Sequence, residues 1–325
     1  MIISGKFELY KVSFPIKCMS SRSILTAVAK LALHAPTYMN AAALTSDPVE
    51  RMKNVVTFSI SFCYSAHTFE KPLNPILGET YQARMEDGTE VMLEQVCHHP
   101  PISFMLLEGP NKLYRYSSYS SFSPKAHLNS IDLCVKGHKE VEFSDGSKIT
   151  FNPPPDSFKN TLWGGALVHQ ITGRVDFEDA TNGITAYYEI GNGGIKSNPK
   201  DYFKGEILVG GKSVCSIYGN YMGYCDFDGV RYWDVRQQVS YLPVDIDKAE
   251  KAIPGGVLPL LLPSDTTYRP DSRTLEAGDV EAAQLRKNEM EEQQRYDRKL
   301  REAVDKRRKA GGQKHCLEHP LGARK

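Results

Sequence analysis

Apolar residues recur at helical spacing in the N-terminal part of the chain. Residues 23–33 place apolar side chains three and four positions apart, which predicts a short helix. A second helix is predicted to begin at Asp47, because aspartate is a favourable N-cap, Pro48 fits the first helical position and Glu50 completes a capping box. An apolar stripe then continues to about Tyr64, where this helix is expected to end.

The pattern changes at about residue 76 and predicts β-structure as far as residue 240. Short runs rich in Val, Ile, Tyr, Phe and Thr alternate with turn dipeptides, and residues 141–151 form two strands around Asp145-Gly146. Helices do not alternate with these strands, so a dinucleotide-binding α/β fold is disfavoured and an antiparallel barrel or sandwich is favoured. A large barrel with an apolar lining can enclose a hydrophobic ligand.

The C-terminal part begins with a proline-rich connector over residues 242–270. A strongly charged helix is predicted from about Asp279 to Ala310, with Gly311 and the glycine after it as the stop signal. Residues 313–325 show no periodic pattern and are expected to form a loose tail.

Composition narrows the class of protein. Hydrophobic residues make up 41% of the chain, enough for a sizeable core, and a net charge of +1 gives no reason to expect a nucleic-acid partner. The seven cysteines include no Cys-x-x-Cys pair, which favours reduced cysteines in a cytoplasmic protein and no zinc or redox motif. We find no signal peptide and no apolar run of the roughly 20 residues that a membrane span needs, so membranes would be met from the water side. No metal and no cofactor is expected.

Residues 94–101 read Glu-Gln-Val-Cys-His-His-Pro-Pro and form the most distinctive motif. The two prolines restrict the backbone after a predicted strand, so His98 and His99 lie on a rigid loop. Imidazoles held in this way can donate hydrogen bonds to an anion. A metal site lacks a third and fourth ligand at suitable spacing, and a rigid turn with incidental histidines remains the alternative.

Residues 71–79, Lys-Pro-Leu-Asn-Pro-Ile-Leu-Gly-Glu, form a second motif between the helical and β regions. Lys71 supplies a positive charge and Asn74 an amide donor, and both suit phosphate oxygens. A simple helix-to-strand connector is the alternative.

A third set of charges lies on the C-terminal helix. Lys287, Glu291 and Arg295 are spaced four residues apart, so Glu291 can orient both cations through i,i+4 pairs. Two cations on one helical face can bind a phosphate, although an ordinary solvated helix would look similar.

Together these motifs resemble those of the oxysterol-binding protein family. The segment 94–101 resembles the family signature E-Q-V-S-H-H-P-P with Cys97 in place of serine, and 71–79 matches K-P-x-N-P-x-L-G-E without a mismatch. The helix pattern Lys-x-x-x-Glu-x-x-x-Arg and the segment 268–273 are also similar, and the resemblance extends from Lys11 to Arg308. The chain departs from the family at Tyr221, where many members carry tryptophan, and after Gly312, where it lacks a Trp-rich end.

The resemblance implies an α+β fold dominated by β-structure. A large near-closed antiparallel β-barrel would enclose a lipid tunnel, with N-terminal helices and a lid at one end and C-terminal helices at the other. We expect a single domain over 1–325. Its parts would be 1–70 (lid and helices), 71–240 (barrel), 241–312 (connector and helix) and 313–325 (tail).

The resemblance also implies the residues of the site. The headgroup of a phosphoinositide would be held by Lys71, Leu73, Asn74, Glu79, His98, His99, Lys287, Glu291 and Arg295. The apolar residues of the first segment are the candidates for lid and tunnel contacts: Ile2, Ile3, Phe7, Leu9 and Val12.

The implied function is lipid transfer without catalysis. The protein would bind phosphatidylinositol 4-phosphate and exchange it for a second lipid between membranes, with a sterol favoured over phosphatidylserine. We expect a cytoplasmic monomer that contacts membranes peripherally, at membrane contact sites. The alternatives are a phosphoinositide sensor that carries no cargo, and a lipid hydrolase with His98 or His99 as general base. The hydrolase lacks a Gly-x-Ser-x-Gly nucleophile motif.

Overall fold

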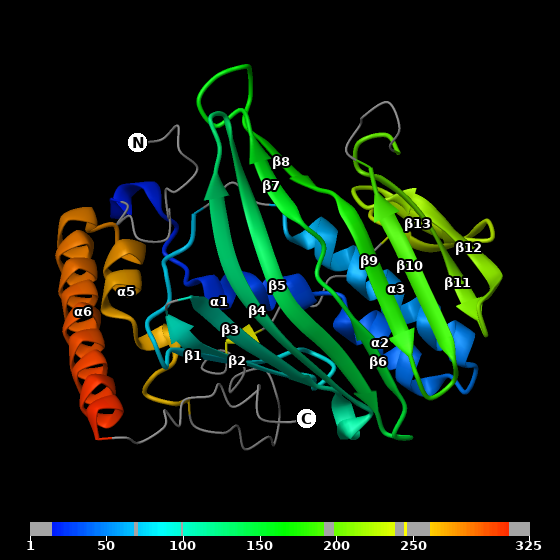
Figure 1. Ribbon diagram of the computed structural model, residues 1–325, viewed down its shortest axis with the longest axis horizontal. Helices are drawn as coiled ribbons and strands as arrows, with labels where there is room; N and C mark the ends of the chain where they lie inside the picture. The colour runs from blue at the N-terminus through cyan, green and yellow to red at the C-terminus, as the bar shows by residue number, and fades with distance from the viewer. Residues whose placement is uncertain are drawn as a thin grey trace. The chain divides into compact units, whose positions relative to one another are not determined.

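A computed structural model describes residues 15–67, 71–98, 100–191, 198–237, 244–245 and 261–311 (Figure 1). Contacts group the chain into two compact units, Met1–Arg269 and Pro270–Lys325. The helices of the first unit are α1 (Ile24–Ala29), α2 (Ala35–Leu44) and α3 (Pro48–Ser65), and those of the second are α5 (Pro270–Glu276) and α6 (Val280–Ala310). None of these helices combines the length and apolarity needed to cross a membrane.

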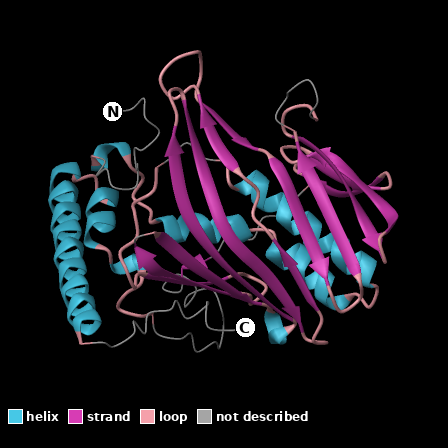
Figure 2. Ribbon diagram, in the orientation of Figure 1, coloured by secondary structure: helices cyan, strands magenta, loops and turns pink. Residues whose placement is uncertain are grey.

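The strands all belong to the first unit (Figure 2). They are β1 (Thr80–Arg84), β2 (Glu90–His98), β3 (Pro101–Glu108), β4 (Tyr114–Ala126), β5 (Ser130–Phe143), β6 (Lys148–Phe151), β7 (Asp156–Lys159), β8 (Val168–Ile171), β9 (Gly173–Asp179), β10 (Ile184–Ile190), β11 (Tyr202–Val209), β12 (Lys212–Asn220), β13 (Tyr224–Phe227), β14 (Val230–Asp234) and β15 (Val244–Asp245).

The strands form one antiparallel sheet in the order β14-β13-β12-β11-β10-β9-β6-β5-β4-β3-β2-β1-β15, with β7 pairing β5 and β8 beside this path. Most neighbours are consecutive in the chain, because tight turns such as Gly210-Gly211 and Asp228-Gly229 join them. The prediction of a strand-dominated α+β fold built on a large antiparallel sheet is confirmed.

Local signals fix the start of α3. The side chain of Asp47 accepts a hydrogen bond from the backbone N–H two residues on (2.9 Å), and Pro48 occupies the first turn, as predicted. The capping box differs from the prediction. The Asp47 N–H donates to Thr45 Oγ1 (3.2 Å), while the Glu50 carboxylate accepts from the Tyr232 hydroxyl at 2.7 and 2.8 Å. The Glu50 carboxylate therefore binds Tyr232, which is distant in sequence, instead of the backbone N–H of Asp47.

The other predicted helices are also present. Ser23 caps α1, which continues as a short 3-10 turn, so the predicted helix over 23–33 is confirmed in its start and approximate length. In the second unit, Asp279 accepts from the Ala282 N–H (2.9 Å) at the start of α6, and Gly311 follows its last residue.

Helix α3 packs on one face of the sheet, here called the inner face (Figure 1). The Phe58 and Tyr116 rings meet edge to face at 5.6 Å, and the Ser59 hydroxyl lies 2.9 Å from the Tyr188 hydroxyl. Because the buried side chains of α3 are mostly large and apolar, this contact forms the centre of the hydrophobic core.

Candidate functional site

The 71–79 loop connects α3 to β1 and is held by backbone pairing with the start of α1. The Leu73 side chain is fully buried, its N–H donates to Arg22 O (2.8 Å), and its carbonyl accepts from the Ile24 N–H (3.0 Å). The Lys71 carbonyl accepts from the Ser20 N–H (2.9 Å). Leu73 therefore anchors the loop in the core, and its buried side chain supports the neighbouring polar residues.

The buried side chain of Glu79 holds this loop in place through hydrogen bonds. Its carboxylate is 1% exposed and accepts hydrogen bonds from the Ser23 hydroxyl, the Ile76 N–H (2.9 Å) and Arg269 Nη1 (2.9 Å). Arg269 Nη1 also donates to the Asn74 carbonyl (2.9 Å). Burial raises the pKa of the Glu79 carboxyl, and the Arg269 charge acts in the opposite direction. Glu79 is therefore a positioning residue that fixes the loop conformation.

Two polar side chains remain at the surface of the same loop. Lys71 is half-buried, Asn74 is exposed, and Lys71 Nζ lies 3.3 Å from Asn74 Oδ1. A lysine ammonium and an asparagine amide on a braced loop form a small donor pair of the kind that binds phosphate oxygens.

The end of β2 is tied to this loop by two backbone hydrogen bonds. Gly78 N–H donates to Gln95 O and Gln95 N–H to Glu79 O, both at 2.9 Å. Three residues further along β2, His98 pairs in register with Pro101 of β3. Since Gln95 is hydrogen-bonded to the loop, the end of β2 at His98 and the 71–79 loop lie at the same end of the β1–β2 pair. His99 lies outside the described residues.

The inner face of β5 changes from covered to partly open along the strand. Val141 and Phe143 are buried under the helices, whereas Ile131, Leu133 and Val135, at the same alternating phase, are only partly covered by the described residues. An apolar wall that the described residues cover only in part is suited to the body of a lipid. The lid candidates Ile2, Ile3, Phe7, Leu9 and Val12 lie outside the described residues.

In the second unit, Glu291 links the two predicted cations of α6. Lys287 Nζ lies 2.5 Å from Glu291 Oε1, and Arg295 Nη2 lies 3.1 Å from Glu291 Oε2. The expected i,i+4 geometry is therefore present. These three residues belong to a different compact unit from Lys71 and His98.

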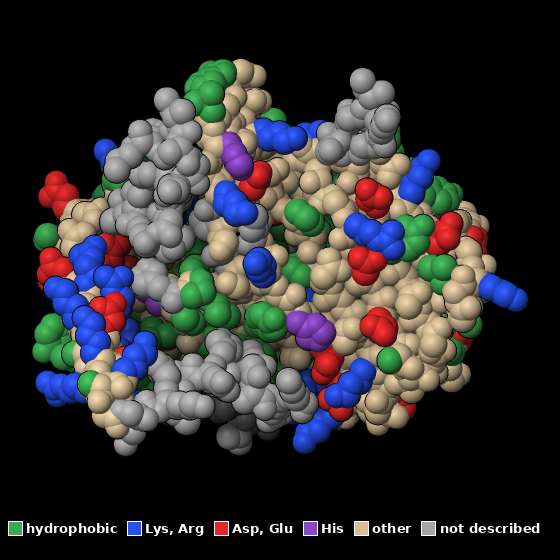
Figure 3. Space-filling view, in the orientation of Figure 1, with side chains coloured by type: hydrophobic (Ala, Val, Ile, Leu, Met, Phe, Trp, Pro, Cys, Tyr) green, Lys and Arg blue, Asp and Glu red, His purple; other side chains and the backbone are tan. Residues whose placement is uncertain are grey.

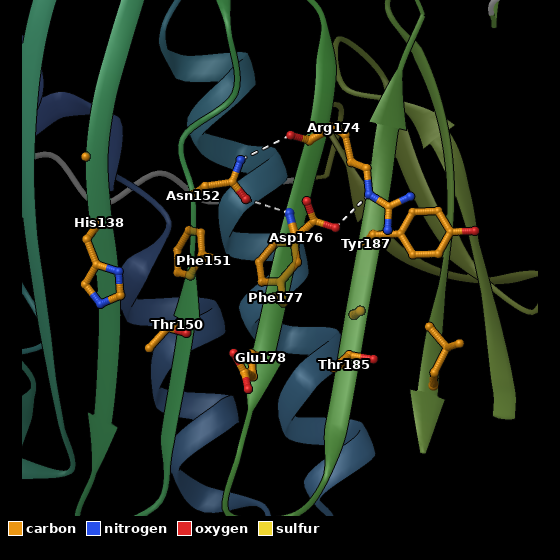
Figure 4. Close-up of a pocket in the computed structure, with 13 residues that line it drawn as sticks. His138, Thr150, Phe151, Asn152, Arg174, Asp176, Phe177, Glu178, Thr185 and Tyr187 are labelled. Atoms are coloured by element: carbon orange, nitrogen blue, oxygen red, sulfur yellow. Dashed lines mark hydrogen bonds and ion pairs between the residues drawn. The ribbon is translucent and has the colours of Figure 1, made fainter. Parts of the chain in front are cut away.

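A hollow of about 550 Å³ on the outer face of the sheet is a different feature (Figure 4). Its polar side chains bind one another: Asp176 Oδ1 accepts from Arg174 Nε (2.6 Å), and Asn152 Oδ1 accepts from the Asp176 N–H (2.7 Å). The Arg174 guanidinium also stacks 3.8 Å from the Tyr187 ring centroid. Because these groups are satisfied within the hollow, we do not assign the ligand site to it.

Sequence reasoning did not identify Arg269 as a support of the site. Its partners Asn74 and Glu79 lie about 190 positions earlier, so no local periodicity could connect them. The one sequence feature that could have indicated Arg269 is the similarity of segment 268–273 to the corresponding segment of the family.

Comparison with known proteins identifies the class to which this fold belongs. The oxysterol-binding protein family model matches residues 4–311. Oxysterol-binding protein 9 of Dictyostelium discoideum is 32% identical over 92% of this chain and 72% of its own length. The chain belongs to the oxysterol-binding protein family, whose members are lipid-binding and lipid-transfer proteins and not enzymes.

Other relatives and solved structures agree with this assignment. Oxysterol-binding protein-related protein 3B of Arabidopsis thaliana is 30% identical over 90% of the chain. The chain spans 66% of that relative and 37% of human oxysterol-binding protein-related protein 1. The Osh1 ORD domain in complex with ergosterol and the Osh3 ORD of Saccharomyces cerevisiae in complex with PI(4)P each share the fold, with a TM-score of 0.75, 24% identity and 92% of this chain covered. The matched regions make up 78% of the Osh1 structure and 82% of the Osh3 structure.

Proposed function

We propose that this protein binds the headgroup of phosphatidylinositol 4-phosphate and exchanges this lipid for a second lipid between membranes. The observation that carries the proposal is the braced loop: Glu79 and Arg269 fix the backbone that presents Lys71 and Asn74 beside the end of β2. His98, together with His99, Lys287, Glu291 and Arg295, would supply the remaining phosphate contacts. The half-covered apolar wall of β5 would hold the acyl chains or the second lipid.

The second lipid is proposed to be a sterol in the first place, with phosphatidylserine as the alternative. Solved structures of the same fold carry ergosterol, cholesterol and PI(4)P, which supports one cavity used in turn by two lipids. Competition for a single cavity lets a gradient of one lipid drive transport of the other. A cytoplasmic monomer that touches membranes only transiently would fit this cycle.

Removing the headgroup contacts tests the proposal directly. The double variant Lys71→Ala with His98→Ala is expected to extract phosphatidylinositol 4-phosphate from liposomes at least tenfold less well, because each charge-assisted hydrogen bond contributes about 1.5–3 kcal/mol. The matched control is Lys212→Ala with His138→Ala, which removes the same residue types from exposed positions elsewhere on the sheet.

Three outcomes would contradict or change this assignment. Extraction at the wild-type level by the double variant would contradict the headgroup site. Extraction without donor-to-acceptor transfer in pure liposomes would favour the sensor, and recovery of cleaved lipid after incubation with purified protein would favour the hydrolase.

One exposed apolar loop supports the proposed peripheral contact with membranes. Leu162 and Trp163, between β7 and β8, are 65% and 53% exposed, and Leu128 lies exposed at the β4–β5 turn. Asn129 clamps the loop: its Oδ1 accepts from the Leu162 and Trp163 N–H groups (2.9 and 3.1 Å) and its Nδ2 donates to Trp163 O (2.8 Å). Figure 3 shows hydrophobic side chains gathered at this end of the sheet. Exposed Trp and Leu on a rigid loop suit the interfacial region of a bilayer.

The double variant Leu162→Ser with Trp163→Ser is therefore expected to associate with liposomes at least tenfold more weakly, because burying such side chains contributes about 1.5–3 kcal/mol each. Cosedimentation with liposomes measures this effect. The control variant Val214→Ser with Val230→Ser removes exposed apolar side chains from other strands, at 49% and 61% exposure. Equal loss in both variants would argue against a specific contact.

A further inference from the structure

A lysine lies on the inner face of the sheet, where β5 passes under α3. Lys139 is 8% exposed, and its cross-strand neighbours are Ser118 on β4 and Phe151 on β6. Its Nζ lies 4.1 Å from the centre of the Phe62 ring and 5.7 Å from that of Phe151. The ammonium group is therefore enclosed by protein and faces aromatic rings.

Within the part of the chain that the structure describes, no carboxylate forms an ion pair with Lys139. Burial lowers the pKa of the Lys139 amine to about 8, and its interaction with the Cys63 thiol acts in the opposite direction. At neutral pH the side chain is thus still mostly protonated. A buried cation without a counterion is unfavourable, and the cation–π contacts offset only part of its desolvation.

Other polar side chains share this region of the inner face. Gln95, Ser103 and Ser118 are all buried and point inward from β2, β3 and β4, and the Ser103 hydroxyl donates to Gln95 Oε1 (2.6 Å). Further along β5, at the same phase as Lys139, the wall becomes apolar and half-covered at Val135 and Leu133. The inner face therefore combines an apolar wall with a polar inner end that carries one positive charge.

We infer that Lys139 binds the acidic group of a lipid that enters the cavity with this group first. This inference rests on the proposed function and narrows its second lipid. The ligand class is an amphiphile with a single carboxylate or sulfate at one end of an apolar body, such as an acidic sterol or a long-chain acid. Its acidic group would supply Lys139 with a counterion, which the described residues do not provide and a neutral sterol cannot.

The test compares acidic and neutral probes of the same shape on the full chain. Cholesteryl sulfate is expected to bind the wild-type protein at least tenfold more tightly than cholesterol, and oleate more tightly than oleyl alcohol. The variant Lys139→Met removes the charge but keeps an unbranched side chain only one atom shorter, so it is expected to lose both preferences while still binding cholesterol. Lys136→Met, on the outer face of the same strand, is the control and should keep them.

A second measurement uses the pH dependence of the wild-type protein. Cholesteryl sulfate stays charged at all relevant pH values, so its affinity should fall by about tenfold between pH 7 and pH 9 as Lys139 loses its proton. The fully buried titratable side chains on the inner face of the described sheet and on α3 near Lys139 include Cys63, Tyr116 and Tyr188. Burial raises the pKa of all three, that of Cys63 to about 11, so none of them titrates in this range.

The possible failures are distinguishable. Equal affinity for cholesteryl sulfate and cholesterol in the wild-type protein, or an acid preference that survives in Lys139→Met, would overturn the inference while phosphoinositide extraction continues. If neither probe binds and phosphoinositide is not extracted, the proposed function fails together with the inference.

Discussion

Replacing Glu79 with alanine is expected to lower the free energy of unfolding by about 3–5 kcal/mol. The reason is the buried guanidinium of Arg269, which is 6% exposed and would lose its carboxylate partner. The Ser23 hydroxyl and the Ile76 N–H would lose their acceptor in the same step.

Chemical denaturation of the purified variant measures this loss. Glu79→Gln keeps an acceptor of similar shape and should cost less than the alanine variant. Asp176→Ala is the control, because its pair with Arg174 is exposed on both sides and such pairs contribute roughly 0–1 kcal/mol. A loss in Glu79→Ala no larger than that of the control would refute the role of Glu79 as a central support of the loop.

A variant that remains folded would also report on function. Since Arg269 and Glu79 fix the backbone beside Asn74, weaker phosphoinositide extraction is expected from Glu79→Gln even though the Glu79 side chain is buried. Such a result would separate positioning of the donors from direct contact.

Replacing Lys139 with methionine is expected to raise the free energy of unfolding at pH 7 by about 3 kcal/mol. The pKa of Lys139 falls from 10.5 to about 8 on folding, and each unit corresponds to about 1.4 kcal/mol. Because the folded protein holds this proton less tightly than the unfolded chain, the destabilising contribution of Lys139 should disappear as the pH rises from about 8 to 10.5.

Denaturation of both proteins across this pH range measures the effect. The advantage of Lys139→Met should be largest at and below pH 8 and should shrink towards pH 10.5. An advantage that does not change with pH would mean that the lysine is not forced to carry its charge in a buried site. The same experiment with bound cholesteryl sulfate should show the wild-type protein recovering stability at pH 7.

The ends of helices could be predicted from the sequence because their causes are local. Asp47, Asp279 and Gly311 act on backbone groups within four residues, so their roles were visible in the printed chain. Glu50 shows the limit of this reasoning. Its cap was plausible locally, but the Tyr232 hydroxyl, 182 positions later, binds its carboxylate instead.

In the candidate site, too, the local features could be predicted from the sequence and the long-range contacts could not. Motif spacing predicted the loop with Lys71 and Asn74, and the donor pair is present, whereas the brace by Arg269 depends on a contact across 190 positions. The burial of Lys139 could have been predicted from its position in the strand. It occupies the same alternating phase as the apolar residues Val141 and Phe143, which is unusual for a charged residue in a strand.

The pairing of β1 with the C-terminal end of its unit has a consequence for synthesis. Among the described residues, the edge of β1 that faces away from β2 is covered by β15 and by residues 262–265, where Thr80 N–H donates to Ser264 O (3.0 Å) and Gln82 N–H to Asp265 Oδ2 (2.8 Å). About 180 residues separate β1 from Asp265, which a ribosome needs roughly 10–40 s to add. During that interval the nascent chain carries an unprotected strand edge, the kind of surface that recruits other strands. We therefore expect chains that stall before residue 244 to aggregate or to depend on chaperones, while completed chains protect this edge themselves.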